Sequence, residues 1–188
     1  DRRAHAEQLL PLVQRVLAEA GVTMNELTAV VVGVGPGPFT GLRVGVAAAQ
    51  TLAEVLGVPV RGVCSLDAIA REWVDAGDAP TEFVVVADAR RKELYWRRYL
   101  ADGSPAGDPQ VSAPDHLPGL TVVGTVPEQL AAQLHSHLIV ERKLDPGTLA
   151  AKWRTLEPAG EEPYYLRAPD ATVPGARKSA LPRLRASR

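Results

Sequence analysis

Residues 33–45 read GVGPGPFTGLRVG, and this stretch decides the fold. It follows an apolar run, Ala29 to Val32, and leads into VAAAQTLAEVLG. A short, continuous Val-rich run is typical of a buried strand, and a small-residue segment that stops at Gly57 is typical of a helix. We therefore predict a strand over 28–34, a Gly-Pro loop, and a helix over 40–56.

The flanking segments extend this pattern. Residues 58–63 predict a second short strand and residues 66–74 a helix, so the order β-α-β-α with short links favours parallel pairing. Upstream, apolar residues recur at helical spacing and Gly21 provides a stop signal, which predicts an amphipathic first helix. Pro11 predicts a kink in that helix or a start just before it.

The second half of the chain has a different character. Strand-like runs at 82–87 and 93–100 flank a charged turn, and 120–124 predicts another short strand. Helices are predicted over 127–134 and 145–154. From Pro163 onward the sequence is rich in Pro, Arg and Ala without periodicity, and we favour a solvated or docked extension over a nucleic-acid arm.

Composition limits the class of protein. The 188 residues are 46% hydrophobic and 23% charged with a net charge of −1, which suits one domain or two small lobes with a real core. The near-neutral charge disfavours a non-specific nucleic-acid or membrane surface. The single cysteine excludes a disulfide framework. No apolar run approaches 18 residues and no leader is evident, so we expect a cytoplasmic protein without a membrane span.

The glycine loop allows two interpretations. Gly35, Gly37 and Gly41 would let the backbone approach a phosphate, with Thr40 capping the helix and Arg43 in its first turn. The spacing, however, matches neither a Walker A loop nor GxGxxG. We favour glycines that allow close packing, and phosphate binding stays open.

The helix after the loop supports packing. Gly41, Gly45 and Ala48 lie along one side, followed by Thr51 or Leu52. Small residues permit close backbone approach, so this face packs tightly either inside the chain or against a partner.

Four segments resemble the TsaB (YeaZ) family. The segment GPGPFTGLRVGVAAAQTLAEVLGVPVRGVCSLDAIA matches its Gly-Pro-Gly-Ser-Phe-Thr-Gly-Leu-Arg hallmark, with Pro38 in place of Ser. The others are HAEQLLPLVQRVLAEAG, DARRKELYW at 88–96 and EPYYLRAPDA at 162–171. In order, they span residues 5–171.

The resemblance implies an α/β, actin/Hsp70-like (ASKHA) fold with two lobes, 1–78 and 79–171, and a basic tail, 172–188. The family normally opens with a strand carrying an acidic residue and a hairpin, whereas this chain starts at the first helix. The first lobe is therefore expected to lack its opening strands. The region 125–145 is hard to match.

The resemblance also implies a role in making threonylcarbamoyladenosine in ANN-decoding tRNAs. TsaB-type chains are non-catalytic partners of the catalytic subunit TsaD; TsaE, an ATPase, joins through the complex, and TsaC supplies threonylcarbamoyl-adenylate. We expect a homodimer when the chain is alone, contact with tRNA only through the complex, and no cofactor. The expected partner-binding residues are Leu9, Leu10, Val13, Leu17, Gly41, Val44, Gly45 and Ala48. Gly35, Gly37, Thr40 and Gly41 would form a vestigial phosphate loop.

The competing hypothesis is an enzyme of the same superfamily, either an ATP-dependent phosphotransferase or a metallopeptidase. TsaD-type chains carry a His-x-x-x-His metal pair, and Ser65 and Ile69 occupy the matching positions here, so no metal site is predicted. His135 and His137 form the one close histidine pair and are a weak metal candidate.

The remaining reactive side chains have structural interpretations. Cys64 is expected to be a buried thiol. Ser65 and Asp67 are expected to cap the helix over 66–74. Asp88 and Glu93 are expected to pair with the basic turn between them.

Overall fold

The chain folds around two β-sheets that share one helix. The computed structural model describes residues 5–167, without the side chains of residues 5 and 6. The predicted tail over 172–188 and the end of the segment 162–171 lie outside the described residues. Within them, no helix is both long and apolar enough to cross a bilayer.

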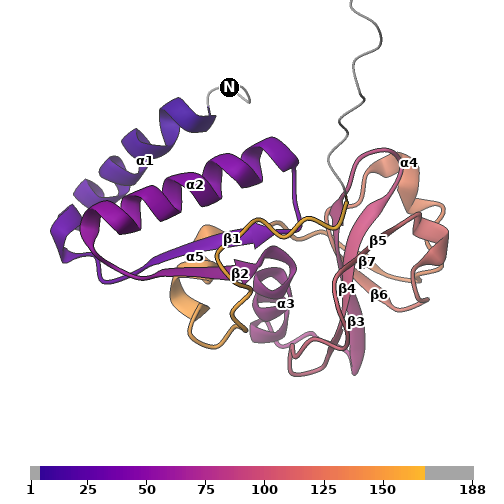
Figure 1. The fold of residues 1–188 in the computed structure, drawn as a ribbon. Helices are drawn as coiled ribbons and strands as arrows, with labels where there is room; N and C mark the ends of the chain where they lie inside the picture. The colour runs from indigo at the N-terminus through magenta and orange to yellow at the C-terminus, as the bar shows by residue number, and fades with distance from the viewer. Residues whose placement is uncertain (1–4, 168–188) are drawn as a thin grey trace, which may run out of the picture.

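The first sheet is a parallel pair between helices. Strand β1 (Val30–Gly35) pairs with β2 (Val60–Cys64), and α2 (Phe39–Leu56) connects them. Figure 1 shows α2 and the outermost helix α1 (His5–Ala20) on one side of this pair, with α3 (Ser65–Asp75) and α5 (Pro146–Lys152) on the other. Among the described residues β1 has one strand neighbour, so its outer edge is open.

The second sheet has five strands in the order β5-β4-β3-β6-β7. They are β3 (Glu82–Asp88), β4 (Leu94–Leu100), β5 (Gln110–Ser112), β6 (Thr121–Gly124) and β7 (Ile139–Val140). Strand β3 pairs antiparallel with β4 and parallel with β6. Short 3₁₀ turns, η1 (Met24–Glu26) and η2 (Pro114–His116), and the one-turn helix α4 (Glu128–Ala131) complete the described elements.

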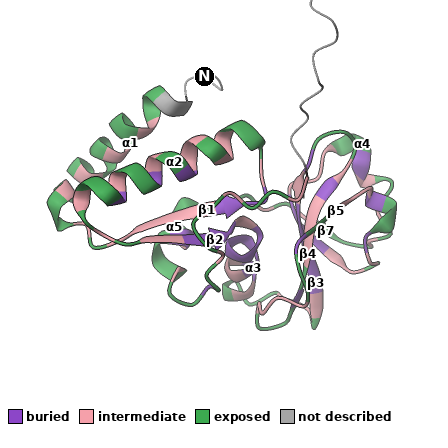
Figure 2. Ribbon diagram, viewed as in Figure 1, coloured by how far each residue is buried: buried purple, intermediate pink, exposed green. Residues whose placement is uncertain are grey.

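The core follows the alternation of the central strand. Phe83 and Val85 face α3, whereas Val84 and Val86 face the other side, where Leu130 of α4 covers them. Helix α3 is buried against both sheets, because Ala68 joins a cluster with β2 and α5 while Ile69 joins the cluster under β3. Figure 2 shows this inner position of α3 and, by contrast, the exposed surfaces of α1 and α2.

The predicted elements are present, with differences at their ends. The first helix runs from His5 through Pro11, so the predicted start just before Pro11 is wrong. Pro11 lies in the second turn of the helix, and six residues precede it in α1. The helix predicted over 127–134 is a single turn. Residues 146–156, assigned by sequence to the second lobe, instead pack on the first sheet, where Leu149 and Leu156 contact its core cluster.

An extended C-terminal segment, residues 157–167, crosses from one sheet to the other, and we call it the strap. The Ala159 N–H donates to the carbonyl of Gly62 at 2.9 Å, and the Tyr164 N–H donates to the carbonyl of Val34 at 2.7 Å. At its end, the Arg167 Nη1 donates to the carbonyl of Ala89 at 3.1 Å. The strap therefore links β2, the end of β1 and the β3–β4 turn (Figure 1).

The strap requires glycine at position 62. A Cβ there would lie 1.8 Å from the carbonyl oxygen of Gly160 and 2.6 Å from Val34. We expect Gly62→Ala to displace the strap and to lower the free energy of unfolding by about 2 kcal/mol or more, a typical cost of overpacking. Urea denaturation provides the measurement.

Gly41→Ala is the matched control. Its added Cβ meets nothing within 4 Å, and alanine favours a helix over glycine by about 1 kcal/mol. This variant should be at least as stable as the wild type. Equal stability of Gly62→Ala and Gly41→Ala would contradict the close approach of the strap to β2.

Candidate functional site

The glycine loop occupies residues 35–38, between β1 and α2. Gly35 has a φ of 114°, and a Cβ there would meet Leu42 at 3.0 Å and the carbonyl oxygen of Tyr164 at 3.2 Å. Gly35 is thus required for packing against the strap. A Cβ at Gly37 or Gly41 meets nothing within 4 Å, so these two glycines serve no close packing inside the chain.

The predicted cap of α2 is wrong. The helix begins at Phe39, so Thr40 lies inside its first turn, and the N-cap residue is Pro38, which has no side chain to cap with. Arg43 does not point freely into the loop, because its guanidinium carbon lies 5.1 Å from the centre of the Phe39 ring. Close packing inside the chain thus explains Gly35 but not Gly37 or Gly41, and the phosphate-loop hypothesis for Gly35, Gly37, Thr40 and Gly41 stays a prediction.

The second candidate is the face formed by α1 and α2, which we call the helix-pair face. The central residues of the α1 stripe, Leu9, Val13 and Leu17, are half-buried and lie on the side that α2 covers. Leu10 on one flank is 49% exposed, and Val16 on the other is 59% exposed. The apolar stripe of α1 is therefore wider than the strip that α2 covers.

Helix α2 contributes small residues to the same region. The predicted partner residues on α2 are all half-buried: Gly41, Val44, Gly45 and Ala48. A Cβ at Gly45, as at Gly41, meets nothing within 4 Å, so these backbone positions are accessible. Val55 continues the stripe two turns beyond Ala48 and is 77% exposed. Sequence reasoning missed Val55, although its spacing of seven residues from Ala48 places it on the same side of the helix.

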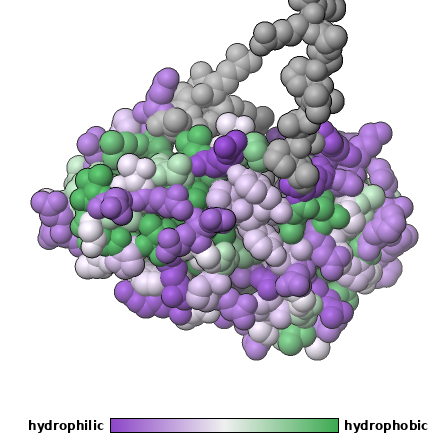
Figure 3. All heavy atoms as spheres, in the orientation of Figure 1, coloured by the Kyte–Doolittle hydropathy of each residue, from purple (hydrophilic) through white to green (hydrophobic). Residues whose placement is uncertain are grey.

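Figure 3 shows hydrophobic residues gathered over the region of α1 and α2, interrupted by hydrophilic side chains. None of the described α1 residues is fully buried, and α2 is the one helix or strand against which α1 packs extensively. An amphipathic helix with so little cover is typical of an element that another surface completes.

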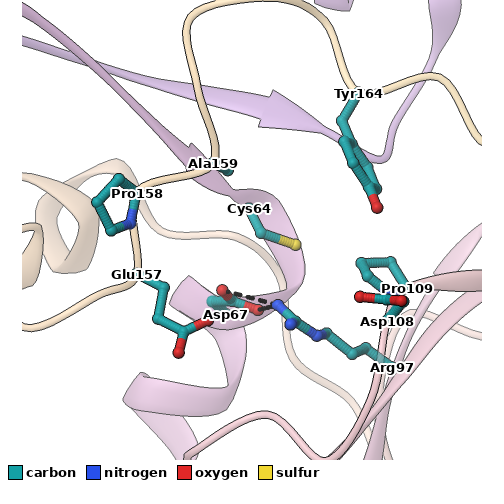
Figure 4. Close-up of a pocket in the computed structure, with 9 residues that line it drawn as sticks. All are labelled: Cys64, Asp67, Arg97, Asp108, Pro109, Glu157, Pro158, Ala159 and Tyr164. Carbon is teal, nitrogen blue, oxygen red and sulfur yellow. Dashed lines mark hydrogen bonds and ion pairs between the residues drawn. The ribbon is translucent and has the colours of Figure 1, made fainter.

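The third candidate is a cavity of about 140 Å³ between the two sheets. Its walls come from the end of β2, α3, β4, the loop before β5 and the strap. Figure 4 shows the Cys64 thiol and the Tyr164 ring projecting toward the same space as the Arg97 guanidinium. Asp108 and Glu157 add two carboxylates to the wall.

Asp67 holds this region together. Among residues 5–167 it is the one buried charged side chain, at 5% exposure. Its Oδ1 accepts hydrogen bonds from Arg97 Nη1 at 2.8 Å and from Tyr99 Oη at 2.6 Å. Arg97 Nε also donates to the carbonyl of Gly107 at 2.8 Å, so the guanidinium is fixed in place.

The structure corrects the predicted role of Asp67. It does not cap α3: the N-cap residue is Cys64, and no side chain makes a cap hydrogen bond there. Ser65 is the first residue of the helix. The signal for a buried partner was present in the sequence, because Asp67 lies between Leu66 and Ala68 in an otherwise apolar stretch. Its partners on β4, however, are thirty and more residues away.

Cys64 is a buried thiol, as predicted, at 4% exposure. Burial, with the charge of Asp67 as a second cause, raises the pKa of Cys64 to about 12. Because only the thiolate is a strong nucleophile, this cysteine is protonated and unreactive at neutral pH. Burial, followed by the same carboxylate, also raises the pKa of Tyr99 well above its ordinary value.

The residues at the expected metal positions are Ser65 and Ile69. Ile69 belongs to the core cluster under β3, and Ser65 is the first residue of α3 and lies beside Gly33 of β1. The exposed His135 and His137 belong to no cluster of three potential ligands; none was found in the described part of the chain. The absence of a metal in the protein stays a prediction.

The chain is similar to a known protein family and to several individual proteins. The model of the family described as tRNA N6-adenosine threonylcarbamoyltransferase matches residues 2–148. An uncharacterised protein of Mycobacterium tuberculosis strain H37Rv is 48% identical over 174 residues, covering 91% of this chain and 79% of that one. The tRNA threonylcarbamoyladenosine biosynthesis protein TsaB of Escherichia coli K12 is 38% identical over 101 residues, covering 53% of this chain and 43% of that protein.

A solved structure supports the fold. YeaZ from Pseudomonas aeruginosa superposes with a TM-score of 0.71 at 27% identity, covering 86% of this chain and 85% of that one. The architecture is thus the actin-like α/β fold that the resemblance to the TsaB family implied.

The Asp67 network leads to a stability prediction. We expect Asp67→Ala to lower the free energy of unfolding by about 3 kcal/mol, because it leaves a mostly buried guanidinium without its carboxylate. The control is Asp75→Ala on the same helix, whose ion pairs with Arg71 and Lys152 are more exposed and worth less than about 1 kcal/mol. Similar losses in the two variants would contradict a special role for Asp67.

The raised pKa of Cys64 leads to a pH prediction. The folded chain keeps the thiol proton up to about pH 12, whereas an unfolded cysteine loses it near pH 9. Stability from this group is therefore fully present below pH 9 and is lost as the pH rises toward 12, by up to about 1.4 kcal/mol per pH unit. Tyr99 acts in the same direction. Denaturation at pH 7.5 and 10.5 should show the loss, and Cys64→Ala should reduce it; an unchanged pH dependence would refute the assignment.

Proposed function

The chain belongs to the TsaB (YeaZ) family, and from this premise we propose that it is a non-catalytic subunit in the threonylcarbamoylation of tRNA. In this role it binds a TsaD-type catalytic subunit, which transfers threonylcarbamoyl to N6 of adenosine 37 in ANN-decoding tRNAs. A TsaE-type ATPase joins the assembly, and tRNA reaches the chain through the complex. Alone, the chain forms a homodimer.

The observation that carries this proposal is the helix-pair face. Its apolar stripe is incompletely covered on α1, and its small residues on α2 leave the backbone open to close approach. A second pair of helices laid across α1 and α2 would bury Leu10, Val16 and Val55, the three most exposed large apolar side chains of the two helices. Burial of such side chains is worth about 1.5–3 kcal/mol each when complete.

The interior of the chain supports a non-catalytic role. The position that matches the second metal-ligating histidine of TsaD holds Ile69, a core residue. The thiol at the cavity between the sheets is protonated at neutral pH, and the carboxylate beside it is committed to Arg97 and Tyr99. These groups stabilise the fold instead of supplying a nucleophile or a metal ligand.

Charge placed on the helix-pair face provides the test. Leu10→Glu and Val16→Glu change half-exposed side chains, so each variant should stay folded. In a complex, however, each new carboxylate is buried without a partner, which costs several kcal/mol, or about a thousandfold in affinity. We expect both variants, like Val13→Glu and Ala48→Glu, to lose binding to the TsaD-type subunit and self-association.

The readout is a reconstituted reaction with TsaD, TsaE, TsaC, tRNA, threonine, bicarbonate and ATP, alongside a partner-binding measurement. The matched control is Leu138→Glu, which changes a leucine that is 53% exposed and lies before β7 on the second sheet. This variant should leave partner binding and tRNA modification unchanged. The non-catalytic role is refuted if modification continues at the wild-type rate after partner binding is lost.

A further inference from the structure

The turn between β3 and β4 is the most strained part of the described backbone. Arg90, Arg91 and Lys92 have φ values of 62°, 53° and 63°, and they are the only non-glycine residues between 5 and 167 with a positive φ. Left-handed backbone disfavours residues with a Cβ, and glycine or asparagine is usual in such turns. Arg90, Arg91 and Lys92 therefore occupy backbone positions at which glycine or asparagine would be favoured.

The surrounding residues hold this turn in place. Asp88 Oδ1 accepts the Arg90 N–H at 2.8 Å, and its Oδ2 lies 2.9 Å from Arg90 Nη1. From the strap, Arg167 donates to the carbonyl of Ala89 and forms an ion pair with Glu93. The turn is thus held from both sides by contacts within the chain.

The turn carries an excess of positive charge on an exposed surface. Among the described residues of the turn and the end of the strap, four cations (Arg90, Arg91, Lys92 and Arg167) lie with two carboxylates (Asp88 and Glu93), a sum of +2 on a chain of net charge −1. Residues 90–92 are all exposed, and the Arg90 side chain is 75% exposed. In a left-handed turn successive side chains point in different directions, which suits several anionic groups spread over a surface better than one carboxylate.

The position of the turn relative to the helix-pair face suggests the occupant. The Tyr165 ring of the strap packs at a tilt of 36° against Phe39 at the start of α2, with ring centres 5.2 Å apart, and Arg167 two residues later contacts the turn. The turn therefore lies near the N-terminal end of α2, and none of its residues belongs to the helix-pair face. Figure 3 shows hydrophilic residues at the corresponding upper end of the second sheet.

We propose that residues 90–92 form a preorganised contact for the phosphate backbone of the tRNA bound by the assembled complex. This rests on the proposed function, which places the chain beside a polyanionic substrate. Lysine and arginine on a fixed turn give affinity without base specificity, since phosphates are alike in all sequences. The strain in the turn is consistent with backbone geometry retained for function.

Asparagine substitution removes the charge but suits the backbone. The variant Arg90→Asn/Arg91→Asn/Lys92→Asn should melt at or above the wild-type temperature, because asparagine tolerates left-handed backbone. In the complex with the TsaD-type subunit, its affinity for an unmodified tRNA transcript with an ANN anticodon should fall roughly tenfold or more at physiological salt. The slope of log K against log salt should become shallower by roughly 2 to 3.

The control removes the same charge elsewhere. Lys143→Gln/Lys152→Gln/Arg154→Gln changes three exposed cations in and around α5, and it should leave the affinity and the salt slope within error of the wild type. The single variant Lys92→Asn, which should reduce the slope by roughly 0.7 to 0.9, keeps the test valid if the triple variant does not fold.

The outcomes separate this inference from the proposed function. An unchanged tRNA affinity and slope in a triple variant that still binds its partner would overturn the RNA contact while leaving the proposed function intact. An equal loss in the control would also overturn it, because net charge alone would then explain the effect. Loss of partner binding by the triple variant would assign the turn to a protein contact instead. Failure of the wild-type chain to bind the TsaD-type subunit would refute the proposed function itself.

Discussion

The two sheets are held in one arrangement by the carboxylate of Asp67, which is buried on α3 and bonded to two side chains of β4. A carboxylate removed from water is costly unless its oxygens are paired. Only one position of α3 against the second sheet brings Arg97 and Tyr99 to it. The network therefore adds little to stability compared with an apolar equivalent of the same shape, but it specifies how the sheets are placed. The cavity, the strap and the β3–β4 turn all depend on that placement.

The strap extends the same constraint to the surface. It meets β2 through Gly62, the end of β1 through Val34, and the turn through Arg167. Helix α1 has the opposite character, since no described residue of it is fully buried and α2 supplies most of its contacts. Local stability should consequently be highest at α3 and lowest at α1, because an element with few buried apolar contacts opens at low cost. Binding of a partner would therefore stabilise α1 most, because α1 has the fewest stabilising contacts within the chain.

The sequence predicted what depends on local patterns and missed what depends on distant contacts. Local patterns predicted the Val-rich strand and the helix that stops at Gly57, because periodicity and turn residues depend on neighbours in the chain. Short motifs were enough to identify the resemblance to TsaB. The role of Asp67 could not be predicted in this way. Its partner Arg97 lies on β4, and the position of β4 relative to α3 depends on contacts between segments far apart in the chain. Thr40 was mistaken for a cap because the start of α2 differs by one residue. The open space around Gly41 could not be inferred from the sequence either. A small residue can pack against another part of the chain, pack against a partner protein or face solvent, and the sequence does not distinguish these cases.

On the proposed function, the helix-pair face has a consequence for regulation of assembly. If one face serves both self-association and binding to the TsaD-type subunit, the two complexes exclude each other. The subunit must then displace a second copy of this chain, and the apparent affinity falls by the fraction of the chain that is dimeric. Leu10 and Val16 would then lie in both contacts, so a substitution there would weaken self-association as well as binding to the TsaD-type subunit. The weaker self-association would partly offset the loss of affinity for that subunit. Residues 90–92 do not belong to that face, so their contact with tRNA in the assembled complex would compete with neither association.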